Sequence, residues 1–119
     1  MKQFPHLVLI AYLLIAASSV SQAKIIDCEP IVSEQIKYSS HSNYVEAVEI
    51  STGKVLWKTI LFSERYVDHY NPNLEEDVQW NIACIRAIQG NEVIVHDGKG
   101  RIFKVSKLNG RIVSKKPKN

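Results

Sequence analysis

Residues 42–57 read SNYVEAVEISTGKVLW, and residues 99–114 read KGRIFKVSKLNGRIVS. Aligned without gaps, the two stretches place Gly53 on Gly110, with a cation directly after each glycine. Each stretch has an alternating segment, a turn that ends in glycine, and a second segment that suits a strand. Alternation with a period of two is typical of strands, and glycine supplies the positive φ that hairpin turns require. The chain therefore contains two similar hairpins.

The neighbouring segments extend this strand pattern. Residues 92–96 and 101–107 alternate on either side of a turn at 97–100, and Asn109-Gly110 is a strong hairpin signal. Short strands separated by frequent turns indicate an antiparallel meander. The expected fold class is all-β and mainly antiparallel, as a small meander or sandwich.

One predicted strand, residues 54–62, is apolar on both faces. Val55, Trp57 and Leu61 lie on one face, and Leu56, Ile60 and Phe62 lie on the other. A strand with two apolar faces is expected to be central and covered on both sides, or to contribute to an interface.

Two segments have weaker patterns. Because Pro30 is incompatible with a central strand, we expect a short strand or arm from Ile31 to Tyr38. Residues 72–88 fit either a helix or a strand, since Asn73 and Glu76 resemble a capping box whereas apolar residues also alternate. The alternating residues are Val78, Trp80, Ile82, Cys84 and Ile88. We favour one helical turn near 72–77 that runs into a strand from Gln79 to Ile88, with Cys84 turned inward.

Residues 47–57, AVEISTGKVLW, resemble the A-x-D-x-x-T-G-x-x-x-W motif of quinoprotein-type (PQQ-like) β-propeller repeats. The resemblance covers mainly residues 44–57 and 91–113, with Glu49 at the aspartate position and Ser114 where the second copy would have tryptophan. It implies blade-like sheets, with the tryptophan packed between neighbouring blades. Closed propellers need about four to eight blades, and this chain supplies two at most. The resemblance also implies an envelope scaffolding role, whereas no cofactor-site motif matches and no cofactor is expected.

The first 23 residues have the pattern of a cleaved secretory signal peptide. Lys2 precedes an apolar run over residues 7–17, and Ser21 and Ala23 are the small residues required at the cleavage site. The run is shorter than the roughly 20 apolar residues of a spanning helix. We therefore expect a single small β domain over residues 24–119, periplasmic or secreted, with no membrane span after cleavage.

Cys28 and Cys84 are the only two cysteines of the chain. In an exported protein they are expected to form a disulfide. Cys28 lies five residues past the predicted cleavage site, so it does not fit a lipid-attachment cysteine, which follows the cut directly.

The charge of the predicted mature chain is unevenly distributed. Residues 24–98 carry six basic and twelve acidic residues, whereas residues 99–119 carry eight basic residues and no acidic one. Such a tail suits nucleic acid or an anionic surface, but these charges follow a strand pattern. We expect them to form a solvated face that partly neutralises the acidic part, with a frayed tail at 115–119 and no nucleic-acid partner.

Chemistry-bearing motifs are sparse. Asp68 and His69 would suit a general base held by a carboxylate, but no nucleophile is marked beside them. Asn71, Asn73, Glu75 and Asp77 imitate the start of a calcium loop without its later glycine and glutamate. We expect no metal site and no enzyme; a small hydrolase that uses Asp68 and His69 is the alternative.

The long polar loop supplies the candidate interaction residues. Tyr66 and Tyr70 lie there with Arg65 and His69, and aromatic and arginine side chains dominate interface hot spots. Trp57 and Trp80 are expected in the core. The predicted function is binding of an envelope or extracellular protein or polymer; a scaffold subunit that associates through sheet edges is a further alternative.

Overall fold

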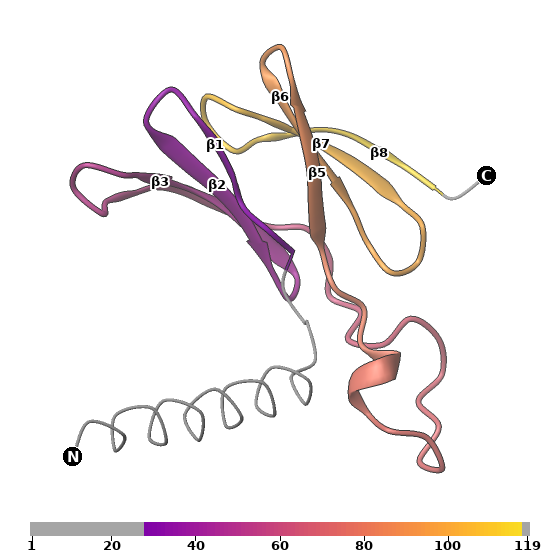
Figure 1. Cartoon of the computed structure of the whole chain (residues 1–119). Coiled ribbons are helices and arrows are strands. Elements are labelled where there is room, and N and C mark those ends of the chain that lie inside the picture. The colour runs from indigo at the N-terminus through magenta and orange to yellow at the C-terminus, as the bar shows by residue number, and fades with distance from the viewer. Residues whose placement is uncertain (1–27, 118–119) are drawn as a thin grey trace, which may run out of the picture.

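The computed structural model describes residues 28–117 and is all-β, which confirms the predicted class. Two four-stranded antiparallel sheets follow one another, each with its strands in chain order (Figure 1). Sheet 1 contains β1 (Ile31–Ser33), β2 (Ile36–His41), β3 (Tyr44–Glu49) and β4 (Val55–Ile60). Sheet 2 contains β5 (Cys84–Gln89), β6 (Glu92–His96), β7 (Ile102–Ser106) and β8 (Ile112–Lys116). The expected signal peptide, residues 1–23, lies outside the described residues.

The two hairpins recognised in the sequence are β3–β4 and β7–β8, and they share one turn structure. Gly53 and Gly110 have φ values of 75° and 78°. Two backbone hydrogen bonds recur at aligned positions: Glu49 N–H to Lys54 O matches Ser106 N–H to Arg111 O, and Gly53 N–H to Glu49 O matches Gly110 N–H to Ser106 O. A third recurs with aligned donors and with acceptors offset by one residue: Ile50 N–H to Gln35 O, and Lys107 N–H to Asn91 O. Even the register shift recurs, because Leu56 and Val113 are skipped in their ladders. The repeat therefore covers both hairpins, and the third contact extends it to the turns before β2 and β6.

An apolar core lies between the two sheets. Sheet 1 contributes Tyr38, Val45, Ala47 and Trp57, and sheet 2 contributes Ile85, Val93, Val95, Phe103 and Val105. The predicted shared faces of Val93 with Val95 and of Phe103 with Val105 are confirmed, since all four are fully buried.

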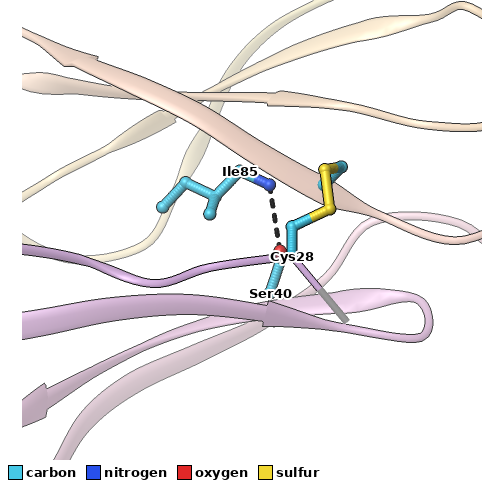
Figure 2. Close-up of a disulfide and its surroundings, with 4 residues drawn as sticks. Cys28, Ser40 and Ile85 are labelled. Atoms are coloured by element: carbon cyan, nitrogen blue, oxygen red, sulfur yellow. Dashed lines mark hydrogen bonds between the residues drawn. A yellow bond between two sulfur atoms is a disulfide. The ribbon is translucent and has the colours of Figure 1, made fainter. Parts of the chain in front are cut away.

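The sheets are joined at one end by the predicted disulfide. Cys28, just before β1, is bonded to Cys84, the first residue of β5, with the two Cα atoms 5.4 Å apart. Beside it, the Ile85 N–H donates to Ser40 Oγ of β2 at 2.9 Å (Figure 2). The acceptor is the hydroxyl oxygen of a serine that is completely buried.

A second junction ties β4 to the β7–β8 turn. The Trp57 indole Nε1–H donates to Lys107 O at 3.0 Å, and the Thr59 hydroxyl donates to Gly110 O. Trp57 also packs against Tyr38, with ring centroids 6.2 Å apart. The tryptophan of the repeat thus lies between the two sheets, as the resemblance implied.

Residues 31–38 form a hairpin and not a single strand or arm. β1 and β2 pair Ile31 with Tyr38, around a two-residue turn at Glu34 and Gln35. Both turn residues have positive φ, 52° and 68°, although neither is glycine. β1 is an edge strand, which agrees with the limit set by Pro30.

The segment 72–88 also differs from expectation. The helical turn is the 3-10 turn η1 (Asp77–Gln79), with no side-chain cap, and β5 begins at Cys84. Residues before Cys84 pair elsewhere: Gln79 O accepts from Val67 N–H, Asn81 N–H donates to Arg65 O, and Ala83 N–H donates to Ser42 O. The inward residue at this point is Ile85, whereas Cys84 is half-buried.

Two edges of the sheets differ from the predictions as well. β4 is an edge strand and not a central one, and Val55, Leu56 and Ile60 are 50%, 41% and 63% exposed. β8 extends to Lys116, so part of the segment expected to fray belongs to sheet 2.

Candidate functional site

A buried carboxylate fixes the base of the long loop to sheet 2. Asp97 Oδ1 accepts the N–H groups of Lys99 and Arg101 at 3.1 and 2.8 Å, and its Oδ2 accepts Arg101 Nε at 2.8 Å and Asn81 Nδ2 at 3.3 Å. Asn81 Oδ1 in turn accepts the Gly98 N–H at 2.7 Å. The turn after β6 and the end of the loop are therefore one hydrogen-bonded unit.

Arg101 links the start of the loop to the same unit. Its guanidinium donates two hydrogen bonds to Glu64, at 3.2 and 3.0 Å, and lies 5.5 Å from the ring centroids of Phe62 and Phe103. The hydrogen bonds from Arg101 lower the pKa of the Glu64 carboxyl to about 2. Both ends of the loop are thus tied to Asp97 through charge-assisted contacts.

Acid is expected to loosen this attachment. Because the pKa of Glu64 lies below its ordinary value of 4.5, its stabilisation is present above about pH 4.5 and is lost as the pH falls towards 2. Glu64→Gln does not titrate, so the variant should lose less unfolding free energy than the wild type over that interval. Urea unfolding at a series of pH values measures the difference. Parallel losses in the two proteins would show that the Glu64–Arg101 contact does not contribute.

Residues 63–82 form a projecting loop with its own internal order (Figure 1). Tyr66 and Trp80 form an isolated antiparallel bridge that closes it. The Gln79 side chain then spans the interior: its Oε1 accepts Asn71 N–H at 2.7 Å, and its Nε2 donates to the carbonyls of Asn71, Leu74 and Glu75. One glutamine therefore holds the conformation of the loop tip.

Glu76 organises the aromatic side of the loop. Its Oε2 accepts the Tyr66 hydroxyl and the Arg65 guanidinium, each at 2.9 Å. The Tyr66 hydrogen bond, which has the largest effect, and the Arg65 guanidinium lower the pKa of the Glu76 carboxyl. The same hydrogen bond to Glu76 raises the pKa of Tyr66. Tyr70 stacks on Tyr66 at a tilt, with ring centroids 4.9 Å apart.

An open groove of about 560 Å³ lies at the base of the loop. One wall is the β2–β3 turn, and the other is formed by the two ends of the loop. The lining residues are His41, Ser42, Asn43, Tyr44, Ser63, Glu64, Arg65, Trp80, Asn81 and Ile82. Groove and loop form one continuous surface, because Arg65 and Trp80 line the groove and also contact the Glu76–Tyr66 cluster.

The structure brings together three of the four candidate interaction residues. Arg65 lies 5.6 Å from the Tyr66 ring centroid, and Tyr66 contacts Tyr70. His69 is exposed beside them, and its backbone N–H donates to Asp68 Oδ1 at 2.9 Å. Because this contact is to the backbone of His69, Asp68 stabilises the local turn and does not orient the His69 imidazole ring.

Sequence reasoning missed part of the groove. Trp80 was expected in the core, but it is only half-buried and lines the groove, so that assignment is wrong. His41 and Tyr44 were not singled out, although their rings lie 5.3 Å apart and Lys58 Nζ lies 4.1 Å from the Tyr44 ring centroid. Their place in the groove follows from the pairing of β2 with β3.

Two of the residues that imitate a calcium loop, Asn71 and Asn73, form a turn. Asn71 Oδ1 accepts the Asn73 N–H at 2.9 Å, so their alternation stabilises a turn. Within residues 28–117, no group of three or more His, Cys, Asp or Glu side chains is arranged to hold a metal ion. No helix in this part of the chain is long and apolar enough to cross a membrane.

No family model and no curated protein matches this chain. Among solved structures, the chain is similar to the crystal structure of BamB from Moraxella catarrhalis, with 19% sequence identity and a TM-score of 0.49. The similar region covers 71% of this chain and 21% of that chain, so this protein spans about a fifth of the length of the protein it matches. No activity is carried over from this similarity.

Proposed function

We propose that this protein is an exported protein-binding module whose binding element is the loop of residues 63–82, together with the adjoining groove. The disulfide supports export, because such bonds persist in oxidising compartments. In this proposal the loop binds a partner and does not catalyse a reaction.

The observation that carries the proposal is an ordered loop with exposed apolar side chains. Val67, Tyr70, Leu74 and Val78 are 37%, 46%, 54% and 55% exposed. In the isolated protein these four apolar groups are in contact with water, which is unfavourable. Burial against a partner would remove that unfavourable contact. Since the contacts of Gln79 and Glu76 already hold the loop, binding requires little further ordering.

The proposal predicts that the loop's apolar side chains determine affinity. A partner is first isolated by cross-linking in an envelope extract and then purified. Tyr70→Ala and Leu74→Ala should each raise its Kd by about tenfold or more, as expected for interface hot spots. Val32→Ala, at a position 58% exposed on β1, is the matched control and should leave Kd unchanged. Titration calorimetry measures all three.

Gln79→Ala tests the contribution of loop order. It removes no exposed apolar group, so weaker binding with nearly unchanged global stability would support a preorganised loop. The proposal fails if every purified partner binds the Tyr70→Ala and Leu74→Ala proteins as tightly as it binds the wild type.

A further inference from the structure

We propose that one partner of the loop is a second copy of this chain: the loop of one molecule docks on the open edge of β8 of another. This inference rests on the proposed binding role of the loop. It adds a second interaction surface, on sheet 2. The contact then joins two different surfaces of identical chains, the loop of one molecule and β8 of another.

The loop presents apolar groups within a negative field. Residues 63–82 carry five carboxylates against the single guanidinium of Arg65, a net charge of −4. The carboxylates surround the exposed side chains of Tyr70, Leu74 and Val78 in sequence. A complementary surface must therefore be both apolar and basic.

The β8 edge has these two properties. It is the last strand of sheet 2, and Ile112 and Val113 are 39% and 53% exposed. Arg111, Lys115 and Lys116 are exposed beside them. Residues 99–117 contain seven basic residues and no acidic one.

Part of this basic set is already neutralised within the molecule. Arg101 pairs with Glu64 at 3.0 Å, and Lys107 pairs with Glu34 at 3.2 Å. The first pair ties the loop to sheet 2, the second joins the β7–β8 turn to the β1–β2 turn, and neither involves a residue of β8. Lys115 Nζ lies 5.7 Å from the Phe103 ring centroid, whereas Arg111 and Lys116 are exposed and leave positive charge at the β8 edge.

Within one molecule the loop and β8 do not meet. Figure 1 shows the loop projecting beyond the ends of the sheets, while β8 forms the far edge of sheet 2. The two complementary surfaces can therefore combine only between molecules.

Among the other edge strands, β4 also exposes apolar side chains, but it fits the loop less well. It exposes Val55, Leu56 and Ile60, but Lys58 is the only charged residue within the strand, and its Nζ lies over the Tyr44 ring of the same sheet. Charge complementarity thus favours β8 over β4.

Salt dependence provides the first test. Sedimentation equilibrium is run on the mature wild-type protein at about 0.01 M and about 1 M salt, where the screening lengths are about 30 Å and 3 Å. The weight-average mass should rise with protein concentration at low salt and fall towards the monomer value at high salt. A monomer at every concentration in low salt would overturn the proposal.

Complementary charge reversals provide the second test. The loop variant is Asp68→Lys with Glu75→Lys, and the edge variant is Arg111→Glu with Lys116→Glu. Each should raise the self-association Kd by about tenfold or more. An equimolar mixture of the two should form a 1:1 complex, because one supplies an intact loop and the other an intact edge. Lys37→Glu, on the exposed face of β2, is the control and should associate as the wild type does.

The outcomes separate this inference from the proposed function. If the mixture stays monomeric, the loop does not dock on β8 and the inference fails. If the edge variant still binds a purified envelope partner as tightly as the wild type, the loop's binding role stands independently of that failure.

Discussion

Gly110→Ala is expected to lower the unfolding free energy by about 3–5 kcal/mol. The residue has φ +78°, a conformation that costs an L-residue about 1–2 kcal/mol. A Cβ atom at this position would also lie 2.6 Å from Trp57 and 2.7 Å from the Thr59 hydroxyl. Trp57 would have to shift, which disturbs its packing and its bond to Lys107 O, at a further cost of about 2–3 kcal/mol.

Gly53→Ala is the matched control for this prediction. The residue occupies the same position in the same turn, with φ +75°, but nothing lies within 4 Å of its would-be Cβ. Only the conformational cost applies, so a loss of about 1–2 kcal/mol is expected. Chemical denaturation of both variants, with m-values compared, gives the difference. Equal losses would mean that Trp57 does not depend on the close approach of Gly110.

The repeat could be predicted from sequence because its determinants are local. Gly53 and Gly110 mark the turns, and the alternation of β3 and β7 assigns inward faces without knowledge of the partner strand. The same backbone hydrogen bonds, at aligned positions, close the turns of both copies. Local chemistry was sufficient here.

The first hairpin could not be predicted, because its turn has no local signal. Glu34 and Gln35 adopt positive φ without glycine or asparagine, and the conformation is held by long-range pairing. Tyr38 is almost fully buried, and Ile50 N–H donates to Gln35 O at 3.0 Å. Tertiary contacts override the turn preference of the sequence.

The candidate site likewise has one part that could be predicted from the sequence and one part that could not. Arg65, Tyr66 and Tyr70 gather because they are neighbours in one loop, which the sequence indicates. The groove wall at His41 and Tyr44 comes from 20 or more residues earlier in the chain, and sheet topology places it. Trp80 was misassigned because apolar residues alternate without a break through residues 78–88. Within that segment the backbone pairing changes from the loop to sheet 2, and the alternation gives no sign of the change.

Loss of the disulfide is the second large effect that we expect. The protein with Cys28→Ser and Cys84→Ser should unfold with a free energy about 4 kcal/mol lower than the wild type. The cysteines are 56 positions apart, and opening a loop of that length restores entropy mainly to the unfolded chain. For a domain of this size, whose total stability is about 5–15 kcal/mol, this is a large share.

The position of the bond suggests how the reduced protein should behave. Ser40 still receives the Ile85 N–H, and Trp57 still contacts the β7–β8 turn, so both sheets retain their other junctions. The reduced protein should therefore remain folded in mild conditions while its denaturation midpoint falls. Reductant should shift the midpoint of the wild type and leave that of the double serine variant unchanged. If reductant leaves the wild-type midpoint in place, the stability of the sheet pair comes from the core and from Trp57, and the disulfide contributes nothing to it.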